Sequence, residues 1–519
     1  MCGREFGTGY MKNVYNYLHI REIVSYLVKR NVKTTLKLYL IYQAGDYMKN
    51  QNGRSSESRR RFLKKSGMLA AVPAAANSAY SSAAPNVSGI ASSGAVSGSK
   101  WEDEYNYGHT ILFMEEYHRN ILEILGCLTG ELGHIGELSS RAANVIRNGG
   151  TVCQSMNLGH MPIYEQKEDR RGNPGVIKDH KTMTDEVNAA SIPQPSFDYL
   201  KEGDMVFTNY CNKSLRAARD RGVYVVSVTV NYIKNEFQPE GYVLPNEDDL
   251  VLGDVSSEIL HSYIPVEQGL VHMPEMPYMA VCPSSSNILG TIHWMLSGEI
   301  ANKLADSRAK EVDKSAEYLR ILTERVHKVK PVHMERIRGS AVEMTRRVLD
   351  GGRWFARSLE HRGLQSELTG VASGPWMPNR GDWNANIEKN NMLIAGISAA
   401  YQDEVKLALE KQLEGAFVIG IGPSSLDGIV PPGRLIDVAD AGFDNFSPES
   451  GGVITIKGRD DSICPTSGIM SNVIQQMICA QWADEMARRG SVPYFCFGIY
   501  RVGREFYQQM AAFAEGRGY

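Results

Sequence analysis

The segment Cys282-Pro-Ser-Ser-Ser-Asn287 decides the fold, because a close variant, Cys464-Pro-Thr-Ser-Gly-Ile469, returns at a spacing of 182 residues (464 minus 282). A Ser or Thr directly after Pro is typical of a helix start. At the same spacing, apolar residues with helical i, i+3, i+4, i+8 periodicity fall on one another. These pairs are Ile292/Ile474, Met295/Met477, Leu296/Ile478, Ile300/Trp482, Ala301/Ala483 and Leu304/Met486. The sequence therefore predicts one helix, with one apolar face, written twice.

Two further pairs keep this order along the chain. A predicted helix runs into Gly149-Gly150 in the first half and into Gly351-Gly352 in the second, and the strand-like segment 202–208 resembles 414–420. Short, continuously apolar strands that alternate with helices indicate parallel sheets covered on both faces. We predict an α/β protein with two doubly wound, flavodoxin-type three-layer domains in tandem, at 105–308 and 309–519. We expect the two domains to pair within the chain.

The segment Ser58-Arg-Arg-Arg-Phe-Leu-Lys64 matches the twin-arginine export pattern S-R-R-x-F-L-K, and an Ala-rich, weakly apolar stretch follows it. We predict a signal peptide at 48–84, a linker at 85–104, contact with the twin-arginine (Tat) translocase during export, and a periplasmic or otherwise exported protein. Residues 1–47 precede a normal signal start at Met48. They are predicted to be a non-native or mobile extension, and the alternative is a membrane-surface helix.

Composition excludes several classes of function. The 519 residues carry a net charge of −3, with no concentrated basic stretch of the kind that binds nucleic acid. The eight cysteines form no C-x-x-C pair, and no Cys/His cluster has zinc spacing, so no metal site is predicted. Cys153 and Cys496 lie in apolar runs and are expected to be small buried hydrophobes. No stretch is long and apolar enough to span a membrane.

The first half resembles the sugar isomerase (SIS) domain, and in particular bacterial sugar-isomerase-like proteins related to phosphoheptose isomerase. Helices up to Arg147 lead into a first strand and a loop, where Gly159-His160-Met161 is similar to the end of the family's G-T-G-H-S-H-M. Gly222–Val228 is similar to a later family strand. Asp249–Asp254 resembles another family strand, of the form A-D-x-x-I-D-x. The second half resembles the family mainly through the first.

The resemblance implies a ligand site at the carboxyl edge of the first sheet. There, loops beside helix N-termini favour an anion such as a sugar phosphate, and small hydroxylated residues allow close approach. No cofactor is implied. The ligand-binding positions implied by the resemblance lie in three loops, and they are Ser155, Asn157, Gly159, Thr208, Asn209, Asn212, Ser214, Ser284 and Ser285.

Aldose–ketose isomerisation needs a base that moves a proton between carbons and an acid that serves the oxygens. The candidates are Glu165, His160 and His293. Glu165 follows the first loop where relatives often carry Glu, and His293 lies where phosphoheptose isomerases place a functional His. The alternative for His293 is a hydrogen-bonded histidine beside the apolar stripe, and for Glu165 it is a solvated charge.

Two function classes remain open. One is an exported protein that binds a sugar or sugar phosphate without catalysis, and the other is a sugar or sugar-phosphate isomerase. We favour the first, because the second loop lacks the family's S-x-S-G core and sugar phosphates are chiefly cytoplasmic. The second half is expected to be a degenerate, structural copy. The insertion Tyr164–Pro195 is expected to be a solvated excursion, and a lid or partner surface is the alternative. A homodimer and the identity of the ligand are left open.

Overall fold

The computed structural model describes residues 111–156, 170–179, 196–229, 250–265, 268–277, 279–309, 312–358, 372–376, 392–396, 402–424, 433–448, 451–497, 504–517 and 519. The chain divides into two compact units, 1–101 and 102–519, and every described residue belongs to the second. The predicted export signal and linker therefore lie outside the described residues. The domain boundaries 105–308 and 309–519 remain a prediction.

The first sheet, which we call sheet 1, has five parallel strands in the order β2-β1-β3-β4-β5. The strands are β1 (Val152–Ser155), β2 (Lys178–Asp179), β3 (Met205–Thr208), β4 (Tyr224–Val228) and β5 (Glu258–Leu260). Strand β2 is added on one side of β1, and β3, β4 and β5 are then added in turn on its other side. The winding direction therefore changes between β1 and β3. This is the flavodoxin-like strand order.

The second sheet, sheet 2, has four described strands in the order β11-β10-β9-β8, all parallel. They are β8 (Trp354–Arg357), β9 (Met392–Gly396), β10 (Phe417–Gly422) and β11 (Ala441–Asp444). Among these strands the winding runs in one direction only. Strands β1, β3 and β8 are buried at every residue, as expected for sheets covered on both faces. The prediction of parallel α/β architecture is confirmed.

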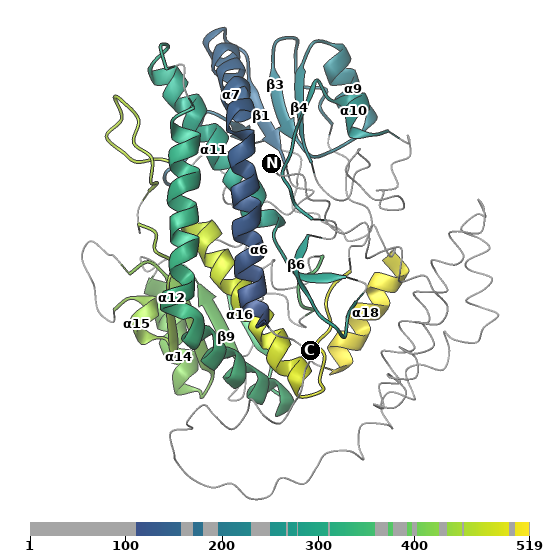
Figure 1. Ribbon diagram of the computed structural model, residues 1–519, viewed down its shortest axis with the longest axis vertical. Helices are drawn as coiled ribbons and strands as arrows, with labels where there is room; N and C mark the ends of the chain where they lie inside the picture. The colour runs from purple at the N-terminus through teal and green to yellow at the C-terminus, as the bar shows by residue number, and fades with distance from the viewer. Residues whose placement is uncertain are drawn as a thin grey trace, which may run out of the picture. The chain divides into compact units, whose positions relative to one another are not determined.

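The helices alternate with these strands, as Figure 1 shows. In the first half they are α6 (Phe113–Leu128), the 3-10 turn η1 (Thr129–Glu131), α7 (Leu132–Arg147), α9 (Lys213–Asp220), α10 (Leu252–Val255) and α11 (Ser285–Ala305). In the second half they are α12 (Lys314–Leu349), α14 (Gln402–Leu413), α15 (Leu435–Val438), α16 (Ser467–Arg488) and α18 (Arg504–Arg517). A short antiparallel ribbon, β6 (Gly269–His272) with β7 (Ala280–Pro283), precedes α11.

The twice-written helix corresponds to α11 and α16, and these two helices are buried almost all round. Helix α11 packs against α7 and α12, and α16 packs against α12 and α6, so each touches the long helices of both halves. The apolar face predicted from the sequence is buried in both helices, and the burial extends beyond it. Polar residues such as Asn287, Thr291 and Gln476 are also enclosed, because the other half covers the face that would otherwise meet solvent.

Matching contacts at the two helix starts relate the halves to each other. Cys282 and Cys464 both adopt the left-handed backbone region, with φ of 64° and 61°. The Tyr117 hydroxyl donates to the Pro283 carbonyl at 3.1 Å, and the Tyr318 hydroxyl donates to the Pro465 carbonyl at 3.0 Å. Since separate residues repeat the same bond, the two halves share one local architecture.

The halves also touch directly at these helices. The Asn472 side-chain amide donates to Asn287 Oδ1 at 3.0 Å, and the start of α16 meets Gly290 of α11. Because each partner lies near the start of its own helix, α11 and α16 meet through their N-terminal halves. This contact joins the two halves of the chain, and their pairing as two tandem domains stays a prediction.

The structure corrects how the strands of the two halves correspond. Helices α10 (Leu-Gly-Asp-Val) and α15 (Leu-Ile-Asp-Val) precede the outermost strands β5 and β11, so β10 corresponds to β4. The predicted pairing of 202–208 with 414–420 was wrong by one strand. The strand expected at Asp249–Asp254 was wrong as well, because α10 begins within it and β5 starts only at Glu258. Both errors came from matching short apolar runs without a constraint on their order in the sheet.

Two smaller expectations can be compared with the structure. Cys153 and Cys496 are buried, at 2% and 1% exposure, so the interpretation as small hydrophobes is confirmed. Within the described part of the chain, no helix combines the length and the apolar character that crossing a membrane would require.

Candidate functional site

The candidate site lies at the carboxyl edge of sheet 1, where the winding direction changes. Strand register places Ser155, the last residue of β1, beside Thr208, the last residue of β3. Thr208 in turn lies beside Ser227, the next-to-last residue of β4. In open α/β sheets, ligands bind outside the carboxyl ends of the strands at such a switch point. The structure therefore brings the first-loop position Ser155 and the second-loop position Thr208 together, as the resemblance implied.

Polar groups at the end of β1 are buried without hydrogen bonds to other described residues. Ser155 and Gln154 are fully buried, and Ser155 Oγ and both amide atoms of Gln154 have no partner within the described part of the chain. Buried polar atoms are nearly always hydrogen-bonded, because an unsatisfied one costs about 1–3 kcal/mol. These atoms are therefore the strongest indication of a polar ligand at this edge.

Thr208 holds the turn that follows β3. Its hydroxyl donates to the Ser155 carbonyl at 3.0 Å and accepts from the Tyr210 backbone N–H at 3.1 Å. Asn209, next in the chain, is fully buried. Burial raises the pKa of Tyr210 to about 12, so its phenol remains a neutral group at physiological pH. Thr208 is a positioning residue here, and Asn209 is the position of this turn that stays a candidate ligand contact.

Asn212 and Ser214 have structural partners at the start of α9. Asn212 is the N-cap residue, and its side-chain oxygen accepts from the Leu215 backbone N–H at 2.8 Å. The Ser214 hydroxyl accepts from the Phe197 N–H at 2.7 Å and donates to Asp198 at 3.2 Å. Both side chains help to hold the loop, and their predicted ligand contact stays a prediction.

Ser284 and Ser285, the predicted third-loop contacts, are both bonded to Gln268. Ser284 Oγ donates to the Gln268 carbonyl at 2.9 Å, and Ser285 Oγ donates to the Gln268 side-chain oxygen. All three residues are buried, at 0–1% exposure. The Gln268 side-chain nitrogen has no partner among the described residues. The start of α11 is therefore a closed, neutral cluster.

His293, the predicted catalytic histidine, lies within α11 and is fully buried. Its ring centroid lies 4.5 Å from that of Trp294. The other predicted site residues, Glu165, His160, Asn157 and Gly159, lie outside the described residues. No group of three or more Cys, His, Asp or Glu side chains with metal-binding geometry occurs in the described ranges.

Sequence reasoning missed an exchange of segments between the halves. The Cys464 backbone N–H, just before α16, donates to the Gly172 carbonyl of the first half at 2.8 Å. The Cys282 N–H, just before α11, donates to the Ser373 carbonyl of the second half at 2.7 Å. Gly172 and Ser373 both have positive φ, at 83° and 64°. Each terminal helix therefore begins against a segment that follows the first strand of the other half.

This exchange changes the interpretation of the insertion Tyr164–Pro195. Its described part, 170–179, adds strand β2 to sheet 1, buries Ile177 at 1% exposure and contacts the second half through Gly172. The expectation of a solvated excursion was wrong for these residues. No local sequence signal reported it, because the contact joins residues almost 300 positions apart.

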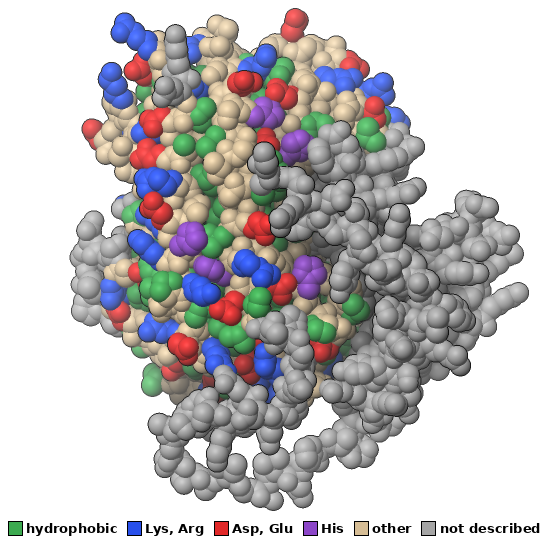
Figure 2. All heavy atoms as spheres, in the orientation of Figure 1, with side chains coloured by type: hydrophobic (Ala, Val, Ile, Leu, Met, Phe, Trp, Pro, Cys, Tyr) green, Lys and Arg blue, Asp and Glu red, His purple; other side chains and the backbone are tan. Residues whose placement is uncertain are grey.

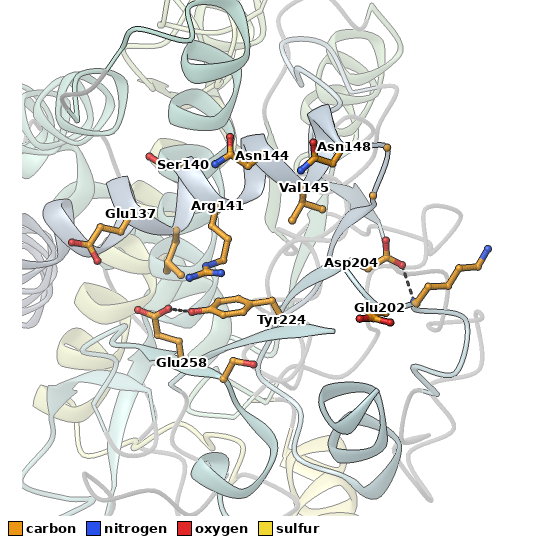
Figure 3. Close-up of a pocket in the computed structure, with 16 residues that line it drawn as sticks. Glu137, Ser140, Arg141, Asn144, Val145, Asn148, Glu202, Asp204, Tyr224 and Glu258 are labelled. Carbon is orange, nitrogen blue, oxygen red and sulfur yellow. Dashed lines mark hydrogen bonds between the residues drawn. The ribbon is translucent and has the colours of Figure 1, made fainter. Parts of the chain in front are cut away.

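A hollow at the opposite, amino edge of sheet 1 has a volume of about 1140 Å³ (Figure 3). It is lined by α7 and by the residues that enter β1, β3, β4 and β5. Its polar groups satisfy one another: Arg141 lies 3.9 Å over the Tyr224 ring, and the Tyr224 hydroxyl donates to Glu258 at 2.5 Å. The Asp204 carboxylate accepts two backbone N–H groups, from Thr151 and Lys201.

A histidine continues this network beside the hollow. His134 bonds Glu258 at 2.7 Å through Nε2 and Glu131 at 3.2 Å through Nδ1, and these bonds join η1 and α7 to β5. Glu131 also accepts from the Tyr263 hydroxyl at 2.7 Å. Since each carboxylate has partners, the network is a structural link. The candidate site remains at the carboxyl edge.

No protein-family model matches the sequence, and no curated protein matches it. Similar solved structures include the C-terminal domain of glucosamine-fructose-6-phosphate aminotransferase from Francisella tularensis, at 10% identity and TM-score 0.40, covering 75% of this chain and 99% of that one. A candidate phosphosugar isomerase from Clostridium difficile 630 is 11% identical with TM-score 0.41, covering 74% and 96%. A candidate sugar-binding protein from Salmonella typhimurium LT2 is 13% identical with TM-score 0.34, covering 71% and 99%. The function is therefore argued from this chain's own residues.

Proposed function

We propose that this protein binds a carbohydrate derivative, a sugar or sugar phosphate, at the carboxyl edge of sheet 1 without transforming it. One observation carries the proposal: the switch point between β1 and β3 holds buried Ser155 and Gln154, whose side-chain polar atoms have no partner among the described residues. A ligand rich in hydroxyl groups at the end of β1 would satisfy Ser155 Oγ, because each sugar hydroxyl both donates and accepts.

The chemistry of the described edge favours recognition by neutral groups. The Ser155 hydroxyl ends β1 and the Asn209 amide directly follows β3, at positions that by resemblance line the sugar phosphate in SIS domains. Such a set suits a sugar ring as well as a phosphate oxygen. The resemblance in loop order supports a carbohydrate over other polyhydroxylated ligands.

Binding without catalysis is preferred because of His293. A general acid or base must come within hydrogen-bond reach of the proton that it moves. His293 is enclosed in α11, which packs against the long helices of both halves. The alternative function is an isomerase in which Glu165 and His160, from the loop after β1, form the acid–base pair.

A ligand screen tests the binding proposal. Thermal unfolding would be followed with free aldoses, ketoses, amino sugars and their phosphates, since a ligand that binds the folded state raises the Tm. We expect at least one compound to stabilise the protein, and Ser155→Ala to reduce its affinity about ten-fold. The matched control is Ser140→Ala at the opposite edge, whose hydroxyl bonds the Gly136 carbonyl. Equal affinity of the Ser155→Ala and Ser140→Ala variants would show that the ligand does not contact Ser155.

An isomerisation assay separates the two functions. Each stabilising sugar would be incubated with wild type and with Glu165→Ala, and the aldose and ketose forms quantified. No turnover by wild type on any bound sugar is expected. Turnover that disappears in Glu165→Ala would establish the isomerase instead.

Export through the twin-arginine route is part of the proposal and has its own test. The pair Arg59→Lys and Arg60→Lys keeps the charge and removes the recognised guanidinium groups. Cell fractionation should find wild type outside the cytoplasm and the double variant inside it. An unchanged distribution would contradict the export signal.

A further inference from the structure

The second part of α12, after Pro331, carries an exposed stripe with the spacing of a coiled coil. Six exposed residues follow one another at alternating steps of three and four positions, and they are Val332, Glu335, Gly339, Val342, Arg346 and Leu349. We call these residues the α12 stripe. Alternating steps of three and four are the heptad pattern through which two helices pack side by side. The stripe therefore has the geometry to meet another helix along its whole length.

Three residues of the α12 stripe are large and apolar. Val332 is 55% exposed, Val342 38% and Leu349 40%, whereas Met344, on another side of the helix, is fully buried. These three make up half of the exposed large hydrophobic residues in the described part of the chain. Single apolar residues are ordinary at a protein surface, but a row of them on one helix marks an interaction site.

The equivalent face of the first half is polar. Counted back from Gly149-Gly150 and Gly351-Gly352, the last four residues of the α12 stripe correspond to Glu137, Ser140, Asn144 and Arg147 of α7. The first three of these polar residues line the hollow at the amino edge of sheet 1. Both halves use a helix at this place, so the shared fold does not require Val or Leu on the outer face. The apolar residues of the α12 stripe therefore point to a role that α7 does not have.

The α12 stripe is complementary in shape to a second copy of itself that runs antiparallel. With a twofold axis midway between positions 340 and 341, Val332 of one copy lies opposite Leu349 of the other. Gly339 lies opposite Val342, and there is room for the valine, since a Cβ added at Gly339 would meet no atom within 4 Å. The three apolar side chains of each copy are thereby covered by the other copy.

The same axis brings opposite charges together. Glu335 lies opposite Arg346 of the second copy, and the symmetry makes this contact twice. Arg346 pairs with Glu343 at 2.7 Å and with Asp350 at 3.3 Å along its own helix, and its side chain is still 57% exposed. A parallel pair of helices would instead place Glu335 beside Glu335 and Arg346 beside Arg346, and like charges repel. The charges therefore select the antiparallel arrangement.

We propose that two copies of this chain form a symmetric dimer through the α12 stripe, with the two helices antiparallel. At a rise of about 1.5 Å per residue, the seam from Val332 to Leu349 is about 26 Å long. A contact of this length lies at the small end of specific interfaces, so we expect a dissociation constant of about 1 μM or weaker. The dimer gives the second half a function of its own, and it does not depend on sugar binding at the first.

Sedimentation velocity of the full chain over a range of concentrations tests the dimer. We expect wild type to pass from monomer to dimer as the concentration rises. Glu335→Arg and Arg346→Glu should each weaken the dimer about ten-fold or more, because each brings like charges together at two symmetric contacts. The matched control is Glu324→Arg, on the same helix before Pro331, which makes the same change of charge at a 57% exposed side chain. This variant should dimerise like wild type.

Exchange of the two charges keeps the test independent of any loss of folding. The double variant Glu335→Arg, Arg346→Glu restores both pairs with reversed sign and should dimerise like wild type. An equimolar mixture of the two single variants should also form dimers, because one copy then presents two cations to two anions of the other.

Three results would overturn the proposal. The first is a wild type that stays monomeric at the highest concentration measured, and the second is a dimer that neither single variant weakens. The third is a loss of dimer that neither the double variant nor the mixture restores. Sugar binding at Ser155 is measured separately, so either proposal can fail alone.

Discussion

The carboxyl edges of the two sheets lie beside corresponding helices but carry different polar side chains. At sheet 1 the described polar groups are hydroxyls and amides, the winding direction changes beside β1, and Gln268 closes the start of α11. At sheet 2 the described winding is one-directional, and arginines lie at the start of α16. The first strands of the two sheets also differ in their last residue, which is Ser155 in β1 and Arg357, 1% exposed, in β8. The two halves thus repeat the same contacts at their helix starts, while the described polar groups at their sheet edges differ.

The exchanged segments make each helix start depend on the other half. Because Gly172 reaches the start of α16 and Ser373 the start of α11, each edge is built partly by the other half. The face shown in Figure 2 carries mixed charges over α6 and α12, with no single-sign stripe in the part that the structure describes. The difference between the halves lies at the sheet edges, where ligands bind in this architecture.

The largest expected effect concerns two crowded glycines, one in each half, that precede the helices α11 and α16. A Cβ added at Gly269 would lie 2.2 Å from the Ala280 carbonyl oxygen, and one at Gly452 would lie 1.7 Å from the Ile463 carbonyl. We expect Gly269→Ala and Gly452→Ala each to lower the free energy of unfolding by about 3 kcal/mol or more, measured by urea denaturation.

The control is Gly339→Ala in α12, where nothing lies within 4 Å of the added Cβ. This change should be neutral or stabilise by about 0.5–1 kcal/mol, since Ala is the better helix former. A small effect at only one of Gly269 and Gly452 would contradict the structural equivalence of these two positions.

The second prediction sharpens an asymmetry between α11 and α16. The buried Glu299 carboxylate accepts from the Lys314 and Ser315 N–H groups and so caps α12, and it lies 3.5 Å from Lys303. Glu299→Ala should cost about 3 kcal/mol, because the cap is lost and a buried ammonium loses its partner. Its counterpart in α16 is Gln481, and Gln481→Ala should cost less, because no charge is left unpaired. Denaturation curves would measure both, and equal costs would contradict the capping role.

The third prediction concerns pH. Burial lowers the pKa of His118 and of His333, which each bond a backbone carbonyl, of Val326 and Asp444. A histidine whose folded pKa is depressed stabilises the fold fully above its unfolded pKa of about 6.5, and this contribution falls as the pH drops below that value. Stability should therefore decline from pH 7 to pH 5.

The variants His118→Asn and His333→Asn should each flatten this decline, which chemical denaturation at several pH values would measure. His272→Asn is the control, because that ring is 75% exposed. An unchanged slope in both buried variants would show that other groups cause the pH dependence.

The smallest effect separates two kinds of helix start. Asn212 caps α9 through its side chain, and Ser284 caps no N–H of α11. Asn212→Ala should cost about 1 kcal/mol, and Ser284→Ala about 0.5–1 kcal/mol from its single bond to Gln268. A large loss of sugar affinity in Asn212→Ala, beyond its effect on stability, would restore this residue as a ligand contact.

The sequence by itself determined the features that rest on local chemistry. The returning Cys-Pro-Ser/Thr segment marked the starts of α11 and α16, and apolar runs between helices predicted parallel sheets. Such signals survive because helix starts and strand burial depend on neighbours close in the chain. The position Ser155 came from the resemblance to the SIS domain, and the structure has it as the last residue of β1.

Only the tertiary structure showed how the strands of the two halves correspond and which polar groups meet at the sheet edges. The strand order showed that β10 corresponds to β4 and not to β3. The packing showed that Ser284 and Ser285, both predicted to be ligand contacts, are hydrogen-bonded to Gln268. The meeting of Arg170 and Arg325 at α16 could not be read from the sequence, because it joins three segments far apart in the chain. Contacts of that kind arise when two halves pack together, and no local pattern encodes them.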